Sequence, residues 1–196
     1  NVEEGIILED DCVPHPDFFH FASDLLVRYR NDTRVWCISG SNFQNGQYRG
    51  DSSYYFSRYN HCWGWASWRR AWRHYDSSLS QWPVLRDSCL LETIFENRLE
   101  RIYWSNIWER LYLENKPDSW AYRWSFTCLS NGGLTVLPNH NLVENVGFGD
   151  SASHTVDFAY STKTNQGLEA LKHPDFLIRN SEADRFTFAN IFSPPK

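Results

Sequence analysis

The stretch Gly5-Ile6-Ile7-Leu8-Glu9-Asp10-Asp11-Cys12 joins a short apolar run to three consecutive acidic residues. The apolar run predicts a buried central strand, because it is short, rich in β-branched residues and ends abruptly. In α/β proteins, ligands bind outside the carboxyl ends of the strands, which is where these acids are expected to stand. Oxygen ligands at such a place suit a hard divalent cation, Mg²⁺ or Mn²⁺, whose coordination is completed by the phosphates of a substrate. The stretch therefore predicts a metal and diphosphate site in an α/β protein.

The composition fits one compact domain with an ample apolar core. The 196 residues are 41% hydrophobic and 17% aromatic, and this length leaves little room for a second domain. The formal net charge of −5 argues against a nucleic-acid partner, because phosphate binding needs a basic face. No apolar stretch has transmembrane length, and five scattered cysteines are typical of reduced thiols. We therefore expect no transmembrane segment and a protein either free in the cytoplasm or held at the surface of the inner membrane.

Hydrophobic periodicity predicts alternating strands and helices downstream of the acids. Helical spacing of apolar residues is found in 16–30, 66–75, 88–114 and 119–129, and β-type composition in 34–39, 54–58 and 134–137. The intervening region 40–53 is rich in Gly, Ser, Asn and Gln, which predicts a loop. Toward the C-terminus the pattern fades, so we expect an irregular tail over 161–196.

Four segments together resemble one family. They are ILEDD with the helix that follows it, YYFSRYNHCWGWASWRRAW (54–72), PDSWAYRWSFTC (117–128) and LPNHNLVENVGFGDSASHT (137–155). In order and spacing they resemble bacterial, family 2-like glycosyltransferases of the GT-A (nucleotide-diphospho-sugar transferase) fold. The resemblance covers most of the chain and implies a mixed sheet flanked by helices.

The resemblance also implies that much of such an enzyme is missing from this sequence. GT-A enzymes bind their nucleotide with βαβ units that precede the acidic triplet, whereas only eight residues precede Glu9 here. Residues 1–160 are therefore expected to form the C-terminal part of a GT-A catalytic domain, on its metal and acceptor side. Most of the nucleotide-binding half would then lie upstream.

The implied activity is metal-dependent transfer of a sugar, with inversion, from a nucleotide-diphosphate donor to a glycan or lipid-linked acceptor. Such reactions build bacterial polysaccharides, and the Mn²⁺ or Mg²⁺ ion neutralises the leaving diphosphate. By similarity, Asp11 is the direct metal ligand, while Glu9 and Asp10 contact donor hydroxyls or bind the metal through water. The alternative is that the three acids only cap the turn after a strand.

A second metal ligand and a general base are also implied by the resemblance. Several GT-A families supply a late histidine to the ion, which points to His154, although an exposed loop histidine is the alternative. An inverting transferase needs a base for the acceptor hydroxyl, and the family pattern places an acid directly after the first Trp of PDSWAYRW. This chain has Ala121 there. Asp118 is therefore the candidate base and Asp150 a second one, unless Asp118 only favours a helix N-terminus through the dipole.

Aromatic residues dominate the segment around Gly64. Indole faces stack on the apolar faces of sugar rings, and glycine permits close approach of the backbone. Trp63, Gly64 and Trp65 are therefore candidates for substrate binding, with an anchoring role in the core as the alternative. Trp68 and Trp72 stand four residues apart, and we expect both to pack into the core from one helical face.

Two other function classes fit parts of the sequence. A carbohydrate-binding module or lectin would use exposed tryptophans and a metal, but its usual β-sandwich conflicts with the predicted helices. A metal-dependent nucleotidyltransferase or phosphohydrolase would share acids at a strand end. It would also need further acids at a second metal, and the sequence offers no second acidic cluster.

Overall fold

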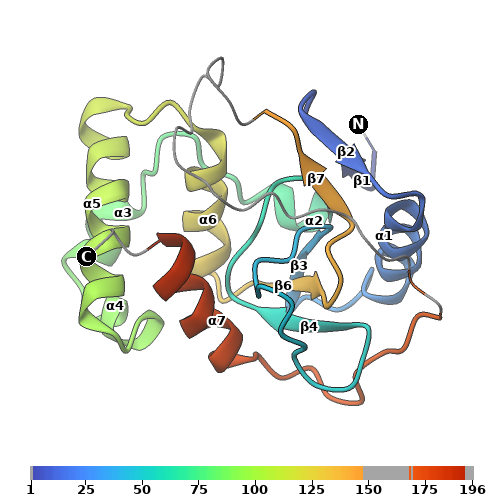
Figure 1. The fold of residues 1–196 in the computed structure, drawn as a ribbon. Helices are drawn as coiled ribbons and strands as arrows, with labels where there is room; N and C mark the ends of the chain where they lie inside the picture. The colour runs from blue at the N-terminus through green and yellow to red at the C-terminus, as the bar shows by residue number, and fades with distance from the viewer. Residues whose placement is uncertain (1, 148–167, 169, 193–196) are drawn as a thin grey trace.

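The computed structural model describes residues 2–147, 168 and 170–192 and contains a mixed five-stranded sheet (Figure 1). The strands are β1 (Glu4–Ile7), β3 (Val35–Ser39), β4 (Tyr54–Ser57), β5 (Trp65–Trp68) and β6 (Leu134–Pro138), in the spatial order β1-β5-β3-β6-β4. Only β3 and β6 pair in parallel, and the other neighbouring pairs are antiparallel. A separate antiparallel ribbon joins β2 (Cys12–Pro14) to β7 (Val143–Asn145).

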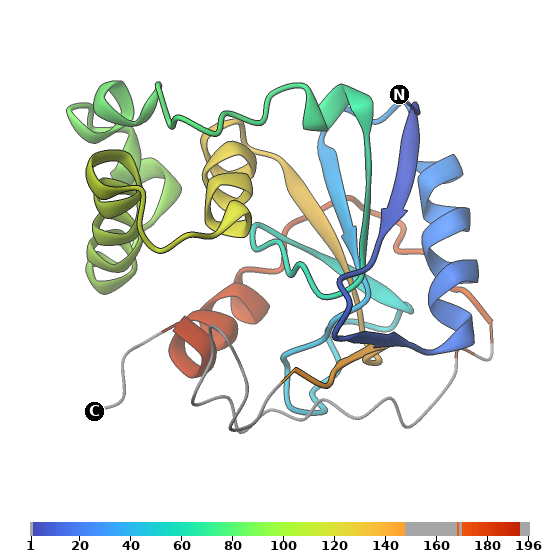
Figure 2. The same ribbon diagram turned by 90° about the horizontal axis from the view of Figure 1, so that it is seen from above.

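Helices cover both faces of the sheet. One face carries α1 (Pro16–Arg28), and the other carries α6 (Trp120–Ser130) with α3 (Trp82–Arg86), α4 (Leu90–Ile94) and α5 (Arg98–Glu114) beyond it (Figure 2). The short α2 (Arg69–Trp72) follows β5, and the chain closes with α7 (Ser181–Thr187) and the π-helical turn η1 (Phe188–Phe192). The prediction of an α/β fold with a mixed sheet flanked by helices is confirmed, while its assignment to the GT-A fold stays a prediction. Among the described helices, none is both long and apolar enough to cross a bilayer.

Local sequence signals explain why α1 forms where it does. Pro16 occupies the first turn, where a missing N–H costs nothing, and the His15 imidazole accepts a hydrogen bond from the Asp17 N–H at 3.2 Å. Phe18, Phe21, Ala22 and Leu25 recur at helical spacing and are fully buried against the sheet. The prediction of this helix is confirmed, with its end two residues earlier than expected.

The opposite face of the sheet is built from aromatic residues. Trp124 and Cys128 of α6 pack with Trp36 and Trp65 of the sheet. Farther from the sheet, a second aromatic cluster joins α3, α5 and α6, with Trp82, Trp104, Trp108 and Phe126 among its members. Burial of side chains this large dominates the packing energy of these helices.

The strand before the acids is not the buried central strand that we expected. β1 lies at an edge of the sheet, because it pairs only with β5 among the described strands. Ile7 is 36% exposed and Leu8 is 38% exposed, so the apolar run keeps one side open. The prediction was wrong about burial, although the acids do follow the strand, with only Leu8 between them.

The prediction of a helix over residues 66–75 is wrong for its first half. Trp65–Trp68 form β5, which lies between β1 and β3 and is buried along its whole length. Helical structure begins only at Arg69. Trp68 is buried within the strand and Trp72 is 40% exposed, so these two residues do not share a core-facing helical surface.

The prediction of an irregular tail over 161–196 is wrong for Ser181–Phe192. The Asn180 side chain caps α7 by accepting a hydrogen bond from the Ala183 N–H at 2.9 Å. The Asn180 N–H in turn donates to the Phe56 carbonyl at 2.8 Å, which fixes this segment against β4. Ala183 and Asp184 are buried, so the C-terminal helix is part of the packed domain.

Candidate functional site

A pocket of about 600 Å³ opens between the end of β1 and the start of α6. Its lining comes from segments far apart in the sequence: Glu9 and Asp11, residues 60–63, residues 117–122 with Ser125, Asn145 with Gly147, and residues 191–192. Phe43 and Trp104 complete it. The pocket thus brings together Glu9, Asp11, Trp63 and Asp118, four of the residues predicted from the sequence.

Hydrogen bonds hold the two pocket acids in defined positions. The Trp120 indole N–H donates to Glu9 Oε1 at 3.1 Å, which ties the end of β1 to the first turn of α6. The Asn145 amide donates to Asp11 Oδ2 at 3.2 Å. Asp10 is exposed and is not part of the pocket lining, so the structure separates it from the other two acids.

The ribbon of β2 and β7 positions Asp11. Cys12 pairs with Asn145 in this ribbon, and the Val146 N–H donates to the Asp11 carbonyl at 2.8 Å. A Cβ atom on Gly147 would lie 2.4 Å from Asp11 Oδ2, closer than real Cβ contacts, so the carboxylate occupies the space that a side chain would need. Asn145 and Gly147 were not singled out from the sequence, because their role depends on this pairing.

Glu9, Asp11 and Cys12 could hold a metal ion, since their ligand atoms all lie within 4.8 Å of one another. Burial raises the pKa of the Cys12 thiol to about 11, so this group is neutral near pH 7. The thiol donates a weak hydrogen bond to Asp11 Oδ1 at 3.6 Å. Hard cations such as Mg²⁺ and Mn²⁺ prefer oxygen ligands to sulfur, so the two carboxylates are the donors in this group that suit them.

The start of α6 also lines the pocket. Ser119 is the N-cap residue of α6, but its side chain makes no capping hydrogen bond. Asp118 directly precedes it, and its exposed carboxylate lines the pocket. Ala121 also lines the pocket. The position at which the resemblance leads us to expect an acid therefore faces the same space as Asp118.

The aromatic candidates divide into one lining residue and two packing residues. Trp63 is half-buried, lines the pocket and meets the Phe43 ring edge-on at 5.1 Å between centroids. Trp65 is only 3% exposed and stacks on Trp120 at 5.4 Å, so it supports the indole that binds Glu9. Gly64 has a φ of +62° and packs closely on Val143, where a Cβ would lie at 2.5 Å. Neither Trp65 nor Gly64 is among the pocket-lining residues, and the contacts described for both are packing contacts, so a substrate-binding role for either stays a prediction.

His61 is a lining residue that the sequence did not single out as a functional candidate. It is 5% exposed, and its ring meets Phe43 edge-on at 4.5 Å. Burial lowers the pKa of His61 to about 3, which keeps the imidazole neutral. Its Nε2 has no hydrogen-bond partner among the described residues, which is unusual for a buried polar atom.

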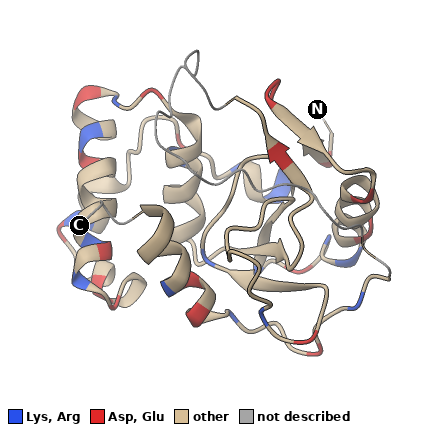
Figure 3. Cartoon of the chain, viewed as in Figure 1, with Lys and Arg blue, Asp and Glu red and all other residues tan. Residues whose placement is uncertain are grey.

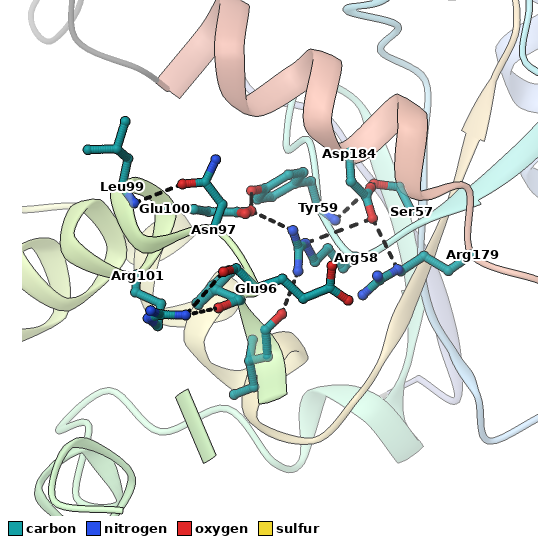
Figure 4. Close-up of polar contacts among 12 residues, drawn as sticks. Ser57, Arg58, Tyr59, Glu96, Asn97, Leu99, Glu100, Arg101, Arg179 and Asp184 are labelled. Carbon is teal, nitrogen blue, oxygen red and sulfur yellow. Dashed lines mark hydrogen bonds and ion pairs between the residues drawn. The ribbon is translucent and has the colours of Figure 1, made fainter. Parts of the chain in front are cut away.

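A buried charged cluster holds two walls of the pocket together (Figure 4). Arg58 forms ion pairs with Glu100 of α5 at 2.7 Å and with Asp184 of α7 at 3.8 Å. Asp184 also accepts a hydrogen bond from Ser57 at 2.6 Å and pairs with Arg179 at 3.4 Å. Burial raises the pKa of Glu100 and that of Asp184.

The charged cluster joins α5 to the α7–η1 segment, and both of these contain residues that line the pocket. Trp104 lies one helical turn after Glu100 in α5, and Phe192 follows Asp184 at the end of η1. The rings of Trp104 and Phe192 pack 5.2 Å apart. Arg58 therefore acts as a clamp between the α5 wall and the α7–η1 wall.

Two predicted residues, His154 and Asp150, lie outside the described residues. The structure therefore gives no information on the second metal ligand or on the second candidate base. All five cysteines are free thiols, as the sequence predicts.

Comparison with models of protein families finds none that matches this chain, and a search of curated proteins finds no match.

Proposed function

We propose that this chain is part of a metal-dependent glycosyltransferase that transfers a sugar from a nucleotide-diphosphate donor to a glycan or lipid-linked acceptor. The observation that carries the proposal is the convergence of Glu9, Asp11, Asp118 and Trp63 in one pocket. Three separate segments of the sequence supply these residues, and their residue types predict this chemistry. The resemblance of four segments to GT-A enzymes supports the same function.

Asp11 and Glu9 would hold a divalent cation, Mn²⁺ or Mg²⁺, on the pocket floor. Such an ion supplies Lewis-acid stabilisation of a leaving diphosphate. Asn145 and Gly147 fix the Asp11 carboxylate, and Trp120 orients Glu9 through its indole N–H. Supporting groups of this kind set the geometry of a metal ligand.

Asp118, which lines the same pocket as the two acids, would accept the proton of the acceptor hydroxyl. An exposed carboxylate at the pocket wall can reach such a hydroxyl directly, as general base catalysis requires. Trp63 would offer its indole face to a sugar ring. A candidate base and a candidate metal site in one pocket suit an inverting displacement.

The alternatives are less well supported by the described residues. A two-metal nucleotidyltransferase or phosphohydrolase needs a second set of ligands, whereas the described residues offer one cluster of three metal-binding groups. A lectin of the β-sandwich type does not match a mixed sheet covered by helices.

The test is donor turnover by the protein expressed from its complete gene. UDP-sugars and GDP-sugars are screened with Mn²⁺ and Mg²⁺ for release of the nucleoside diphosphate, first alone and then with glycan or lipid-linked acceptors. The proposal predicts turnover that chelation abolishes and that Asp11→Asn removes. Asp175→Asn is the control, since this acid is exposed and does not line the pocket. Full turnover in Asp11→Asn would reject the proposed role of Asp11, and a well-folded protein inactive on every donor would reject the function.

A further inference from the structure

The pocket has an unusual balance of charge. Glu9, Asp11 and Asp118 contribute three carboxylates, and the described lining contains no lysine or arginine. Figure 3 shows acidic residues at the turn between β1 and β2 and on the neighbouring strand β7. An anionic group that entered this pocket would therefore meet like charges without a protein cation to offset them.

Two arginines close to the pocket, Arg58 and Arg123, bind groups outside its lining or backbone carbonyls. Arg123 of α6 donates to the Ser77 and Ser119 carbonyls at 2.8 and 3.0 Å, and it also bonds to Asn115. Arg58 is held between Glu100 and Asp184. Neither guanidinium is among the groups that line the pocket.

Neutral polar groups and aromatic rings make up much of the remaining surface. The amides of Asn60 and Asn145 line the pocket, together with Trp63 and Tyr122. The buried His61 Nε2 still lacks a partner among the described residues, although it belongs to this lining. A buried polar atom without a partner points to a ligand that supplies one, and a sugar hydroxyl can do so. Polar atoms set among apolar rings suit a ligand with hydroxyl edges and apolar faces.

We propose that the acceptor sugar bound in this pocket is uncharged or carries an amine, and that acidic acceptor sugars such as uronic acids are rejected. This inference rests on the proposed function, and it names the class of acceptor that the same site takes. A bound divalent cation would add two positive charges to the pocket. The donor diphosphate that it would hold carries at least two negative charges, so the net charge of the pocket would stay negative. The acceptor therefore binds next to a net negative charge. Repulsion between like charges weakens the binding of an acidic acceptor relative to a neutral one.

The experiment uses three methyl glucosides that differ only at C6, which carries a hydroxyl, an amine or a carboxylate. Their affinities for the protein are measured by ligand-observed NMR with Mg²⁺ and inorganic pyrophosphate present, at low and high salt. We expect the carboxylate to bind about tenfold more weakly than the hydroxyl, and the amine to bind at least as well as the hydroxyl. High salt should narrow these differences, because screening weakens interactions between partly exposed charges.

A pair of variants separates the effect of the pocket from the effect of net charge. Asp118→Asn should narrow the ratio between the affinities for the hydroxyl and the carboxylate to about fivefold, because one of three like charges is gone. Asp175→Asn removes the same charge from an exposed position outside the pocket and should leave the ratio unchanged. Equal affinity for the carboxylate and the hydroxyl, a ratio unmoved by Asp118→Asn, or no binding of any of the three would overturn the inference.

Failure of the inference can be told apart from failure of the proposed function. If the protein transfers sugar to acidic and to neutral acceptors at equal rates, the proposed charge selection is wrong and the proposed transferase function is still supported. If the three methyl glucosides bind in the expected order of affinity but the protein turns over no donor, the proposed transferase function is wrong and the charge selection is still supported.

Discussion

Replacing Arg58 by methionine removes the charge from the clamp between α5 and α7 while keeping most of the side-chain volume. The Arg58 side chain is 10% exposed, and its partners Glu100 and Asp184 are 3% and 1% exposed. The substitution would therefore leave two carboxylates buried without their shared cation. The Ser57 hydroxyl and Arg179 would remain as partners of Asp184.

The distances set the size of the effect. At an effective dielectric constant of about 20, the attractions of Arg58 to Glu100 at 2.7 Å and to Asp184 at 3.8 Å are ~6 and ~4 kcal/mol. The cost of burying three charged groups offsets much of this sum. Removal of one partner from a buried pair costs about 3–5 kcal/mol, and we expect Arg58→Met to lower the free energy of unfolding by that amount near neutral pH.

The loss of stability in Arg58→Met should depend on pH. The pKa shifts of Glu100 and Asp184 determine whether it grows or shrinks as the pH falls. Burial raises the pKa of Glu100 and of Asp184 above their values in the unfolded chain. The folded protein therefore takes up protons first as the pH falls, and the penalty for burying the ionised groups then disappears. Without Arg58 both pKa values rise further. The difference in stability between the wild type and Arg58→Met should thus be largest at high pH and shrink in acid.

Urea unfolding followed by tryptophan fluorescence measures this difference at about pH 8 and about pH 5. Arg110→Met is the matched control, because Arg110 is 60% exposed and pairs with Glu114 at 3.8 Å within one helix. Such a pair contributes only about 0.3–0.5 kcal/mol. A loss in Arg58→Met no larger than that in Arg110→Met, or a loss that grows as the pH falls, would refute the role given to the clamp.

Two further predictions concern the pocket itself. Gly147→Ala places a methyl group 2.4 Å from Asp11 Oδ2 and should weaken Mn²⁺ binding about 10–100-fold in an electron paramagnetic resonance titration. Gly5→Ala, whose new methyl would lie 3.9 Å from Val2, should bind as the wild type does, and equal affinities for both variants would contradict the packing argument. Asp118→Asn should slow transfer about 10²–10⁴-fold, and adding Ala121→Asp should restore part of the rate, measured as initial velocity. Unchanged transfer in Asp118→Asn would remove Asp118 from the mechanism.

Elements with strong local signals were predictable from the sequence. The stripe of Phe18, Phe21 and Leu25 behind Pro16 predicts α1, and the glycines at 132–133 predict the break between α6 and β6. β5 was mistaken for helix because it is buried on both faces and shows no alternation of polar and apolar residues. α7 has a capping signal in Asn180, but the residues around it lack a long apolar stripe.

The residue types of the candidate site were visible in the sequence, whereas their arrangement in space was not. The acids after β1 and the residues of 117–122 could be identified as functional candidates from the sequence. Their meeting depends on contacts such as Glu9 with Trp120, which are 111 positions apart. The ribbon that holds Asp11 and the clamp around Arg58 depend in the same way on distant pairings, which spacing along the chain does not reveal. The edge position of β1 likewise follows from which strands pair.

Binding of Mn²⁺ to the wild type and to Asp11→Asn tests the central claim most directly. Electron paramagnetic resonance distinguishes free from bound ion, so a titration gives both stoichiometry and affinity. We predict one bound Mn²⁺ per chain and at least about 100-fold weaker binding in Asp11→Asn, since loss of a direct ligand should exceed the 10–100-fold loss expected for a supporting group. A wild type that binds no Mn²⁺, or an Asp11→Asn variant with undiminished affinity, would contradict the assignment of a metal site to this pocket.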